Sequence, residues 1–348
     1  MKILVTGTDG YIGCMLAPEL VRRGHDVVGV DTGFYRDGWL FNGTSLTPLT
    51  RTGDIRRISP EELRGIEAVV HTAELSNDPA GELDPRVTYE INHQASVRLA
   101  QLAKAAGVRR FVYMSSCSVY GLGSGDALVS ESSQVNPQTT YAECKVLVER
   151  DLAQLADDGF APSYLRNATA YGASPRMRFD CVLNNLAGLA WTTKVIALSS
   201  DGTPWRPIVH LQDIVKAVLA ILEAPTEAIH NQVFNVGSTE QNYRIREIAE
   251  IVAEAFPGCS TRFGEPSPDN RSYRVSFDKI HRALPQFRCD WDARRGARQL
   301  YEVFRRIDMS RETFEFRGFT RLKQLQHLLR TRQIDGHFFW TGEPAEGM

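Results

Sequence analysis

Apolar and polar residues follow one another in the first half of the chain in blocks that predict strands and helices in turn. Short apolar runs, typical of strands buried on both faces, lie at residues 2–6, 26–30, 68–72, 110–115 and 162–166. Apolar side chains recur at helical spacing at residues 11–23, 84–106 and 141–155. Strands that alternate with helices predict an α/β fold with a doubly wound parallel sheet.

The pattern changes near residue 171, where arginines, prolines and shorter elements interrupt the alternation. We therefore expect a first domain over residues 1–170, to which residues 205–240 return, and a smaller lobe over residues 171–348. Residues 308–348 are expected to form a helical tail docked on that lobe, and the sequence indicates no function for it.

Composition narrows the class of protein. The chain has 348 residues, 43% of them hydrophobic, and a formal net charge of −2, which gives no reason to expect nucleic acid as a partner. Its six cysteines show no metal-ligand spacing, so no metal site is predicted. No stretch approaches the roughly 18 apolar residues of a membrane span. The chain opens directly into a strand, and we expect a cytoplasmic enzyme without a membrane partner.

A glycine-rich turn follows the first strand. Gly7, Gly10 and Gly13 are spaced Gly-x-x-Gly-x-x-Gly between that strand and the next helix. Such glycines let the backbone approach a pyrophosphate at the helix N-terminus, which predicts a Rossmann-like dinucleotide site. Asp31 ends the second strand, where a carboxylate accepts from a ribose 2′-hydroxyl and repels a 2′-phosphate. NAD is therefore predicted in preference to NADP.

A second constellation lies at residues 111–145. The apolar run from Phe111 ends in hydroxyl residues that include Ser116, and Tyr141 and Lys145 are four apart in the next predicted helix. Residues four apart share a helix face, so the ammonium should lie beside the phenol and lower its pKa toward neutrality. Such a tyrosine can accept a proton when an alcohol is oxidised, with Ser116 orienting the same oxygen.

Together these residues resemble the extended short-chain dehydrogenase/reductase family, in its nucleotide-sugar epimerase/dehydratase branch and nearest to sugar 4-epimerases. The similarity covers nearly the whole chain, although Glu74 and Thr169 stand where the family usually has alanine and asparagine. It implies NAD, bound by Gly7, Asp9, Gly10, Tyr11, Ile12, Gly13, Asp31, Asp54, Ile55, Thr72, Ala73, Glu74, Asn92, Tyr141 and Lys145. It implies a nucleotide-diphosphate sugar, bound by Ser116, Ser118, Tyr141, Thr169, Asn184, Asn185, Arg206 and Asp269.

The resemblance leaves three functions open. The first is an epimerase that oxidises the sugar, most often at C4, lets the keto sugar turn and returns hydride to the other face. The second is a nucleotide-sugar dehydrogenase or ketoreductase with the same Ser116, Tyr141 and Lys145. The third is a non-catalytic NAD-binding protein. Cys117 and Ser118 replace the acid pair of related dehydratases, which favours a reaction without loss of water. The family also implies a homodimer.

Overall fold

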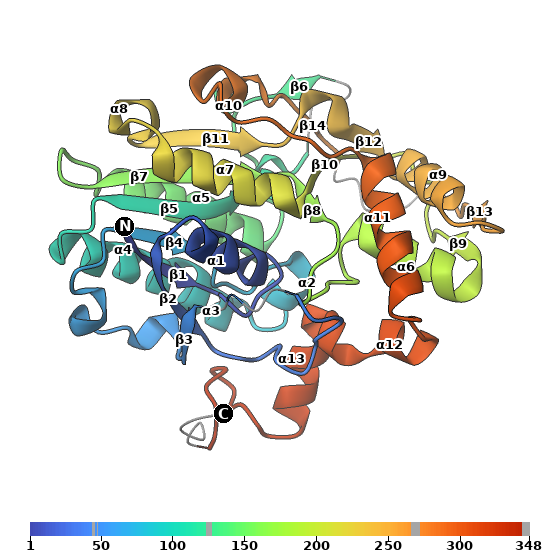
Figure 1. The fold of residues 1–348 in the computed structure, drawn as a ribbon, viewed down its shortest axis with the longest axis horizontal. Coiled ribbons are helices and arrows are strands. Elements are labelled where there is room, and N and C mark those ends of the chain that lie inside the picture. The colour runs from blue at the N-terminus through green and yellow to red at the C-terminus, as the bar shows by residue number, and fades with distance from the viewer. Residues whose placement is uncertain (44–45, 47, 123–126, 266–271, 343–348) are drawn as a thin grey trace.

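A seven-stranded parallel sheet is the framework of the protein (Figure 1). The structure, a computed structural model, describes residues 1–43, 46, 48–122, 127–265 and 272–342. Across the sheet the strand order is β11 (Gln232–Val236), β7 (Ala161–Asn167), β5 (Arg110–Ser116), β4 (Ala68–His71), β1 (Lys2–Thr6), β2 (Asp26–Asp31) and β3 (Leu49–Thr52). The predicted doubly wound α/β fold is confirmed.

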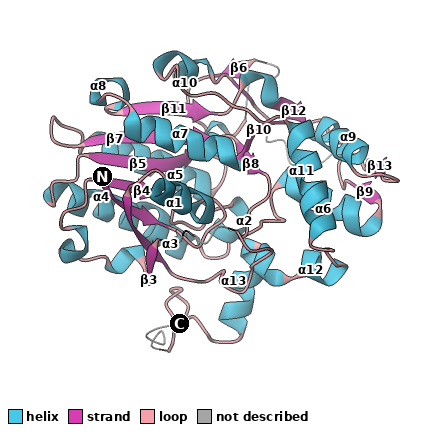
Figure 2. Ribbon diagram, in the orientation of Figure 1, coloured by secondary structure: helices cyan, strands magenta, loops and turns pink. Residues whose placement is uncertain are grey.

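Helices cover both faces of the sheet, because successive side chains of each strand point to opposite sides (Figure 2). Ile3 and Val5 pack in one core with α1 (Gly13–Arg22) and α7 (Leu211–Glu223). Leu4 packs in the opposite core. The helices of that face are α3 (Pro85–Thr88), the π-helical turn η3 (Tyr89–Ala95), α4 (Ser96–Ala105) and α5 (Thr140–Ala153).

The strand order places a crevice at one edge of the sheet. From β1 the chain first builds β2 and β3 on one side and then β4 and β5 on the other. Neighbouring connections therefore leave in opposite directions between β1 and β4, and ligands bind outside the carboxyl ends of the strands at such a point. Short helical turns follow these ends: η1 (Ile55–Arg57), η2 (Pro60–Leu63), α2 (Asp78–Gly81) and η4 (Cys117–Tyr120).

A second body of helices and short strands faces this crevice. Its core gathers α6 (Val182–Thr193), α9 (Ile245–Ala255) and α11 (Ala293–Arg306). A small sheet joins β10 (Trp205–His210) to β8 (Thr169–Tyr171) and β12 (Asn242–Arg244). The remaining strand pairs are β9 (Val195–Ala197) with β13 (Ser260–Arg262), and β6 (Leu128–Val129) with β14 (Arg274–Val275). Short helices before the C-terminal tail are α8 (Thr226–Ile229), η5 (Thr239–Gln241) and α10 (Asp278–Ala283).

The segment that returns to the large sheet is shorter than expected. Of residues 205–240, β11 joins the seven-stranded sheet beside β7, whereas β10 pairs with β8 and β12 in the small sheet. His210 and Asp213 are both buried, and Asp213 accepts hydrogen bonds from the backbone of Asp290 and Trp291. These two side chains therefore support the lobe structurally.

The C-terminal tail lies across both bodies. It contains α12 (Arg311–Glu315), η6 (Arg317–Phe319) and α13 (Arg321–Arg330). Phe319 is buried in the core of the lobe, as expected of a tail docked there. Leu325 and Leu328 of α13 are instead buried with Leu4 in a core of the large sheet, so the expected docking on the lobe describes only part of the tail. Among the described residues, no helix is long and apolar enough to cross a membrane.

Candidate active site

A cavity of about 500 Å³ opens at the carboxyl edge of the large sheet and reaches the lobe. Its lining includes the glycine turn after β1, the end of β2, the loop after β4, and the first turns of α5. From the lobe it includes Thr169, Arg206 and Tyr273. The strand order thus brings the two predicted constellations, which are more than 100 residues apart in sequence, into one cavity.

The glycine turn has the close packing that a dinucleotide site requires. Gly7 has a φ of +78°, and a Cβ there would lie 2.6 Å from Thr72 Oγ1. A Cβ at Gly13 would lie 2.0 Å from the Gly7 carbonyl oxygen, so α1 can begin this close to β1 only with glycine. No acidic residue stands in the first turn of α1, and no side chain caps it. Its N-terminus therefore suits a phosphate group.

Asp31 lies at the end of β2 and lines the cavity. Its carboxylate accepts hydrogen bonds from the backbone N–H of Gly33, at 2.7 Å, and of Asp9, at 3.0 Å. Burial raises its pKa to about 6, and the Asp9 carboxylate adds to the rise. The side chain of Asp9 is bound to Arg36 at 3.0 Å, outside the residues that line the cavity. Of the two, only Asp31 is placed to meet a ribose.

The loop after β3 forms a second wall of this half of the cavity. Asp54 and Ile55 both line it, as does Gly53. Asp54 also caps η1, and its carboxylate pairs with Arg56 at 2.7 Å. The predicted adenine contacts of this loop therefore fall on a segment whose acidic side chain is already fixed by a neighbouring arginine.

Ser116, Tyr141 and Lys145 meet at the other half of the cavity. Ser116 ends β5, and Tyr141 lies in the first turn of α5, which Thr139 caps by accepting from the Ala142 N–H. Lys145 follows one turn later, with its Nζ 5.3 Å from the centre of the Tyr141 ring. The phenol and the ammonium are therefore neighbours, as the four-residue spacing predicts.

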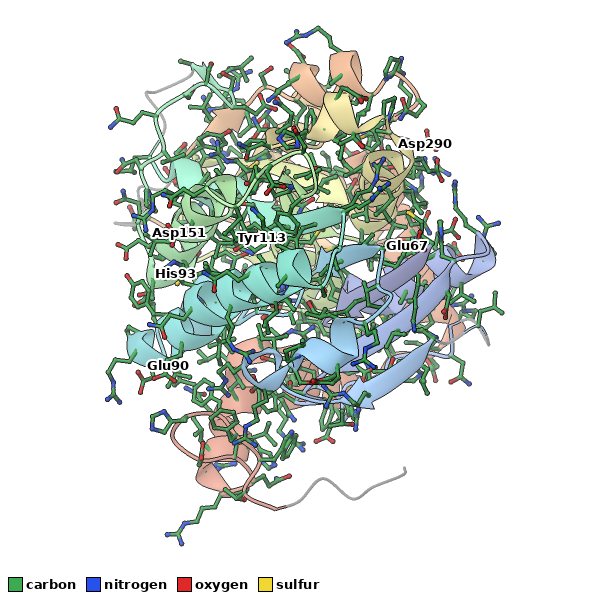
Figure 3. The ribbon with its side chains drawn as sticks, turned by 90° about the vertical axis from the view of Figure 1, so that its left-hand side faces the viewer. Glu67, Glu90, His93, Tyr113, Asp151 and Asp290 are labelled. Atoms are coloured by element: carbon green, nitrogen blue, oxygen red, sulfur yellow. The ribbon has the colours of Figure 1, made fainter. Side chains whose placement is uncertain are left out.

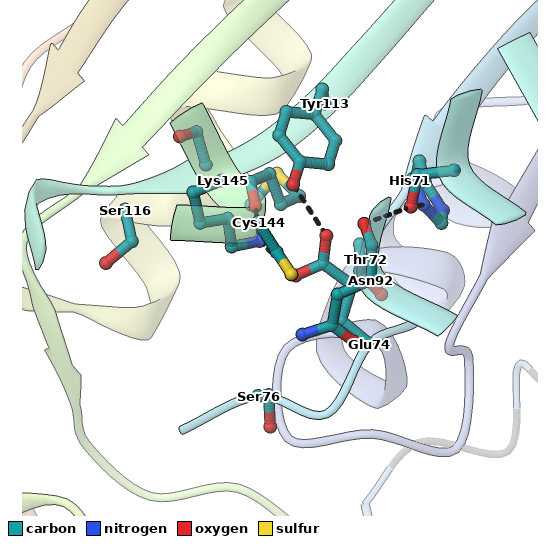
Figure 4. A network of polar contacts seen from close by, with 12 residues as sticks. His71, Thr72, Glu74, Ser76, Asn92, Tyr113, Ser116, Cys144 and Lys145 are labelled. Atoms are coloured by element: carbon teal, nitrogen blue, oxygen red, sulfur yellow. Dashed lines mark hydrogen bonds and ion pairs between the residues drawn. The ribbon is translucent and has the colours of Figure 1, made fainter. Parts of the chain in front are cut away.

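Glu74, which was predicted among the NAD-binding residues, adds a charge whose pairing with Lys145 the sequence does not indicate. Its carboxylate forms an ion pair with Lys145, and the two side chains are only 3% and 4% exposed. The Tyr113 hydroxyl donates to the other carboxylate oxygen at 2.7 Å (Figure 4). Lys145 Nζ also donates to the Met114 carbonyl. The lysine beside Tyr141 therefore has a buried counter-ion.

This ion pair changes the expected electrostatics of Tyr141. Burial raises its pKa above the ordinary value, Lys145 lowers it, and Glu74 and Asp78 raise it again. The Ser116 hydroxyl lowers it. The net direction is upward, so the predicted shift toward neutrality is wrong for this structure. The main reason is burial of the phenol, and the Glu74 carboxylate beside Lys145 offsets part of the positive charge expected to favour the phenolate.

Three predicted binding asparagines are engaged elsewhere. Asn92 is fully buried and bonds the backbone of Leu75 through both ends of its amide, which fixes the loop after β4. Asn184 accepts from the Gly172 N–H and donates to the Tyr11 hydroxyl. Asn185 donates to the Phe179 carbonyl at 3.0 Å. None of the three is among the residues that line the cavity, where these amides support the walls, and their predicted binding roles stay predictions.

The remaining predicted residues divide in two. Ser118, Thr169 and Arg206 line the cavity, as do Tyr11, Ile12, Thr72 and Ala73. Among the described residues, none forms a hydrogen bond with the buried hydroxyl oxygen of Ser118. Asp269 lies outside the described residues.

Several lining residues were not predicted. Arg178 and Asp180, which precede the start of α6, form an ion pair of 2.8 Å and line the cavity. Arg321 of the tail lines it as well. The motif Arg176-Met-Arg178 is visible in the sequence, but nothing local indicates which arginine turns inward. Arg321 could be found only from the tertiary packing of the tail.

Comparisons with known proteins agree with this geometry. The family model "NAD dependent epimerase/dehydratase family" matches residues 3–237. An uncharacterized UDP-glucose epimerase, YtcB of Bacillus subtilis, is 29% identical over 292 residues, which cover 77% of this chain and 88% of YtcB. The UDP-glucose 4-epimerase of Corynebacterium glutamicum is 29% identical over 296 residues, covering 80% and 85%. The structure of MoeE5 in complex with UDP-glucuronic acid and NAD is 27% identical with a TM-score of 0.75, and the match covers 88% of this chain and 99% of that one.

Proposed function

Because the chain belongs to the NAD dependent epimerase/dehydratase family, we propose that it is an epimerase that inverts C4 of a nucleotide-diphosphate sugar. The enzyme is NAD-dependent, as its family is. A UDP-hexose is the first substrate class to assay, because UDP sugars appear in the names of its relatives and structural neighbours. The proposal concerns the reaction and the substrate, which the family leaves open.

The cavity fits NAD through residues already described. The uncapped N-terminus of α1 suits the diphosphate, Asp31 suits the adenine ribose, and Tyr141 with Lys145 mark the nicotinamide end. Bound NAD would accept hydride from the sugar carbon and later return it. The same cavity continues to Arg206 and Tyr273, where a nucleotide-diphosphate sugar would lie.

The protein's part in the reaction is to move a proton and to hold the sugar. Tyr141 would accept the proton of the sugar hydroxyl as the carbon is oxidised, and donate it back to the same oxygen when hydride returns to the other face of the carbon. The Ser116 hydroxyl would bond the same sugar oxygen and keep it beside the phenol. Arg206 would bind the substrate diphosphate, for which a guanidinium is well suited.

The carboxylates near Tyr141 are the observation on which we choose epimerisation over dehydration. Loss of water needs an acid and a base that can exchange protons with the sugar. Glu74 is held by Lys145 and Tyr113, and Asp78 accepts from Thr139 at 2.6 Å. Cys117 is buried, and burial raises its pKa well above the ordinary value of a thiol. These engaged groups favour inversion through hydride transfer over dehydration.

Turnover of UDP-glucose and UDP-galactose in deuterated water tests the proposal. Epimerisation should give the other hexose with no deuterium on carbon and no net NADH. Steady accumulation of NADH would identify a dehydrogenase instead. A product lighter by one water, with deuterium on carbon, would refute inversion. Mass spectrometry of nucleotides that co-purify with the enzyme extends the test to other sugars.

A further inference from the structure

We propose that the C-terminal tail is part of the cofactor site and that Arg321, at the start of α13, binds the diphosphate of NAD. The inference concerns cofactor binding and does not depend on which sugar reaction the enzyme performs. It assigns a role to a segment for which the sequence alone indicates none.

The tail joins the two bodies that enclose the cavity. Its aromatic residues pack on the lobe, where the rings of Phe314 and Phe319 lie 4.9 Å and 5.7 Å from the Phe179 ring. Beyond them, α13 buries its leucines against the large sheet. In Figure 1 the tail accordingly runs from α12 beneath the lobe to α13 beneath the sheet.

The tail also fixes the segment after β2 that walls the cavity. Gln324 donates to the Phe34 carbonyl at 2.8 Å, and the Trp340 indole N–H donates to the Thr32 carbonyl at 2.7 Å. Thr32 and Phe34 line the cavity. The backbones meet closely at Gly38, where a Cβ would lie 2.3 Å from the Gly318 carbonyl oxygen. The tail is therefore packed directly behind the wall near Asp31.

From this position Arg321 extends into the cavity. The residue is 3% exposed, and its guanidinium carbon lies 3.9 Å from the centre of the Tyr35 ring. Its backbone N–H donates to Asp180 at 3.1 Å. Within the described residues, no side chain or carbonyl accepts a hydrogen bond from its guanidinium. Arginine presents five donors, and this guanidinium lines the cavity without a protein acceptor among the described residues, so the geometry points to an anionic ligand.

The neighbours of Arg321 identify which anion fits. Arg321 lines the same cavity as the glycine turn (Gly7, Gly10 and Gly13) and Asp31. Its guanidinium lies over the ring of Tyr35, in the segment that follows Asp31. Its positive charge also lowers the pKa of Asp31, against the rise that burial causes. These contacts place the guanidinium beside the end of β2, in the same cavity as the glycine turn before α1. A dinucleotide places its diphosphate between these two features.

The test is titration of the NAD-free protein with NAD, ADP-ribose and adenosine. Arg321→Met removes the cation and keeps much of the side-chain bulk. Arg330→Met is the matched control, because Arg330 is exposed at the other end of the same helix. We expect Arg321→Met to weaken NAD and ADP-ribose alike, by about 10- to 100-fold, and to leave adenosine unchanged. Arg330→Met should bind all three as the unmodified protein does.

Melting of the NAD-free variants separates binding from folding. Arg321→Met should melt at or above the temperature of the unmodified protein, because a buried charge without an acceptor is removed. Arg321→Lys keeps the positive charge and replaces Arg321→Met in the titrations if the Met variant does not fold. Its NAD affinity should lie between those of the unmodified protein and of Arg321→Met. NAD affinity within twofold of normal in Arg321→Met would overturn the proposal. Equal weakening of adenosine, or weakening of a UDP sugar alone, would also overturn it.

Discussion

Glu74→Gln is the substitution that most directly examines the electrostatics of the site. The change keeps the size of the side chain and an oxygen that can accept from Tyr113, and it removes only the charge. Lys145 then remains 4% exposed without its counter-ion. The negative charge of Glu74 is one of the causes that raise the pKa of Tyr141. Removing that charge should therefore lower the pKa of Tyr141 and favour the phenolate.

The size of the effect follows from the geometry. Lys145 Nζ lies 5.3 Å from the centre of the Tyr141 ring. Two charges at that separation interact by about 3 kcal/mol at an effective dielectric constant of about 20. Glu74 cancels part of this attraction, and the substitution restores that part. On the acidic limb of the pH profile, we expect the rate relative to its plateau to rise about three- to tenfold.

The assay is the pH dependence of kcat for sugar oxidation or epimerisation, measured beside urea unfolding. Because a buried ammonium loses its partner, stability should fall by about 3–5 kcal/mol while the pH profile moves to lower pH. Tyr113→Phe is the matched control, since it removes the 2.7 Å hydrogen bond to Glu74 without changing any charge. Tyr113→Phe should lower the free energy of unfolding by about 1 kcal/mol and leave the pH profile of kcat unchanged. A Glu74→Gln profile that coincides with the unmodified enzyme's would refute this reasoning.

Four further predictions concern Tyr141, Asp31 and the assembly. Tyr141→Phe should reduce turnover by at least about 100-fold and leave NAD affinity within twofold, because only the proton-transferring oxygen is lost; near-normal turnover would require another base. Asp31 should favour NAD over NADP, a preference that Asp31→Asn should weaken in paired titrations. Burial raises the pKa of Asp31 to about 6, so its contribution to stability is present below about 3.8 and lost as pH rises through 6. Urea unfolding should therefore show a flatter dependence over this range for Asp31→Asn. We expect a homodimer in which η3, α4 and α5 pair with the same helices of a second copy. The outer face of these helices carries His93, which is bound to Asp151 at 2.7 Å (Figure 3). Light scattering that shows only monomer at micromolar concentration would contradict this expectation.

Much of the architecture was predictable because it rests on local patterns. Strands buried on both faces give short apolar runs, and β5, β7 and α5 lie within two residues of their predicted ends. The glycine turn and the Tyr141–Lys145 spacing are equally local, and the structure brings both to one cavity. The asparagines show where such local patterns stop. An amide at position 184 has the same local pattern whether it faces a ligand or, as here, the backbone of Gly172.

The features that distinguish this site come from residues distant in sequence. Glu74 acts on Tyr141 only because β4 and β5 are adjacent, which places the loop after β4 against α5. Arg321 follows Asp31 by almost the whole chain, and the two line the same cavity because the tail spans both bodies. In both cases the position of the charge in the cavity depends on a tertiary contact that the sequence does not indicate. The motifs thus specify which atoms can react, whereas the charges around them depend on tertiary contacts. The pH profile of Glu74→Gln and the NAD affinity of Arg321→Met measure those two contacts separately.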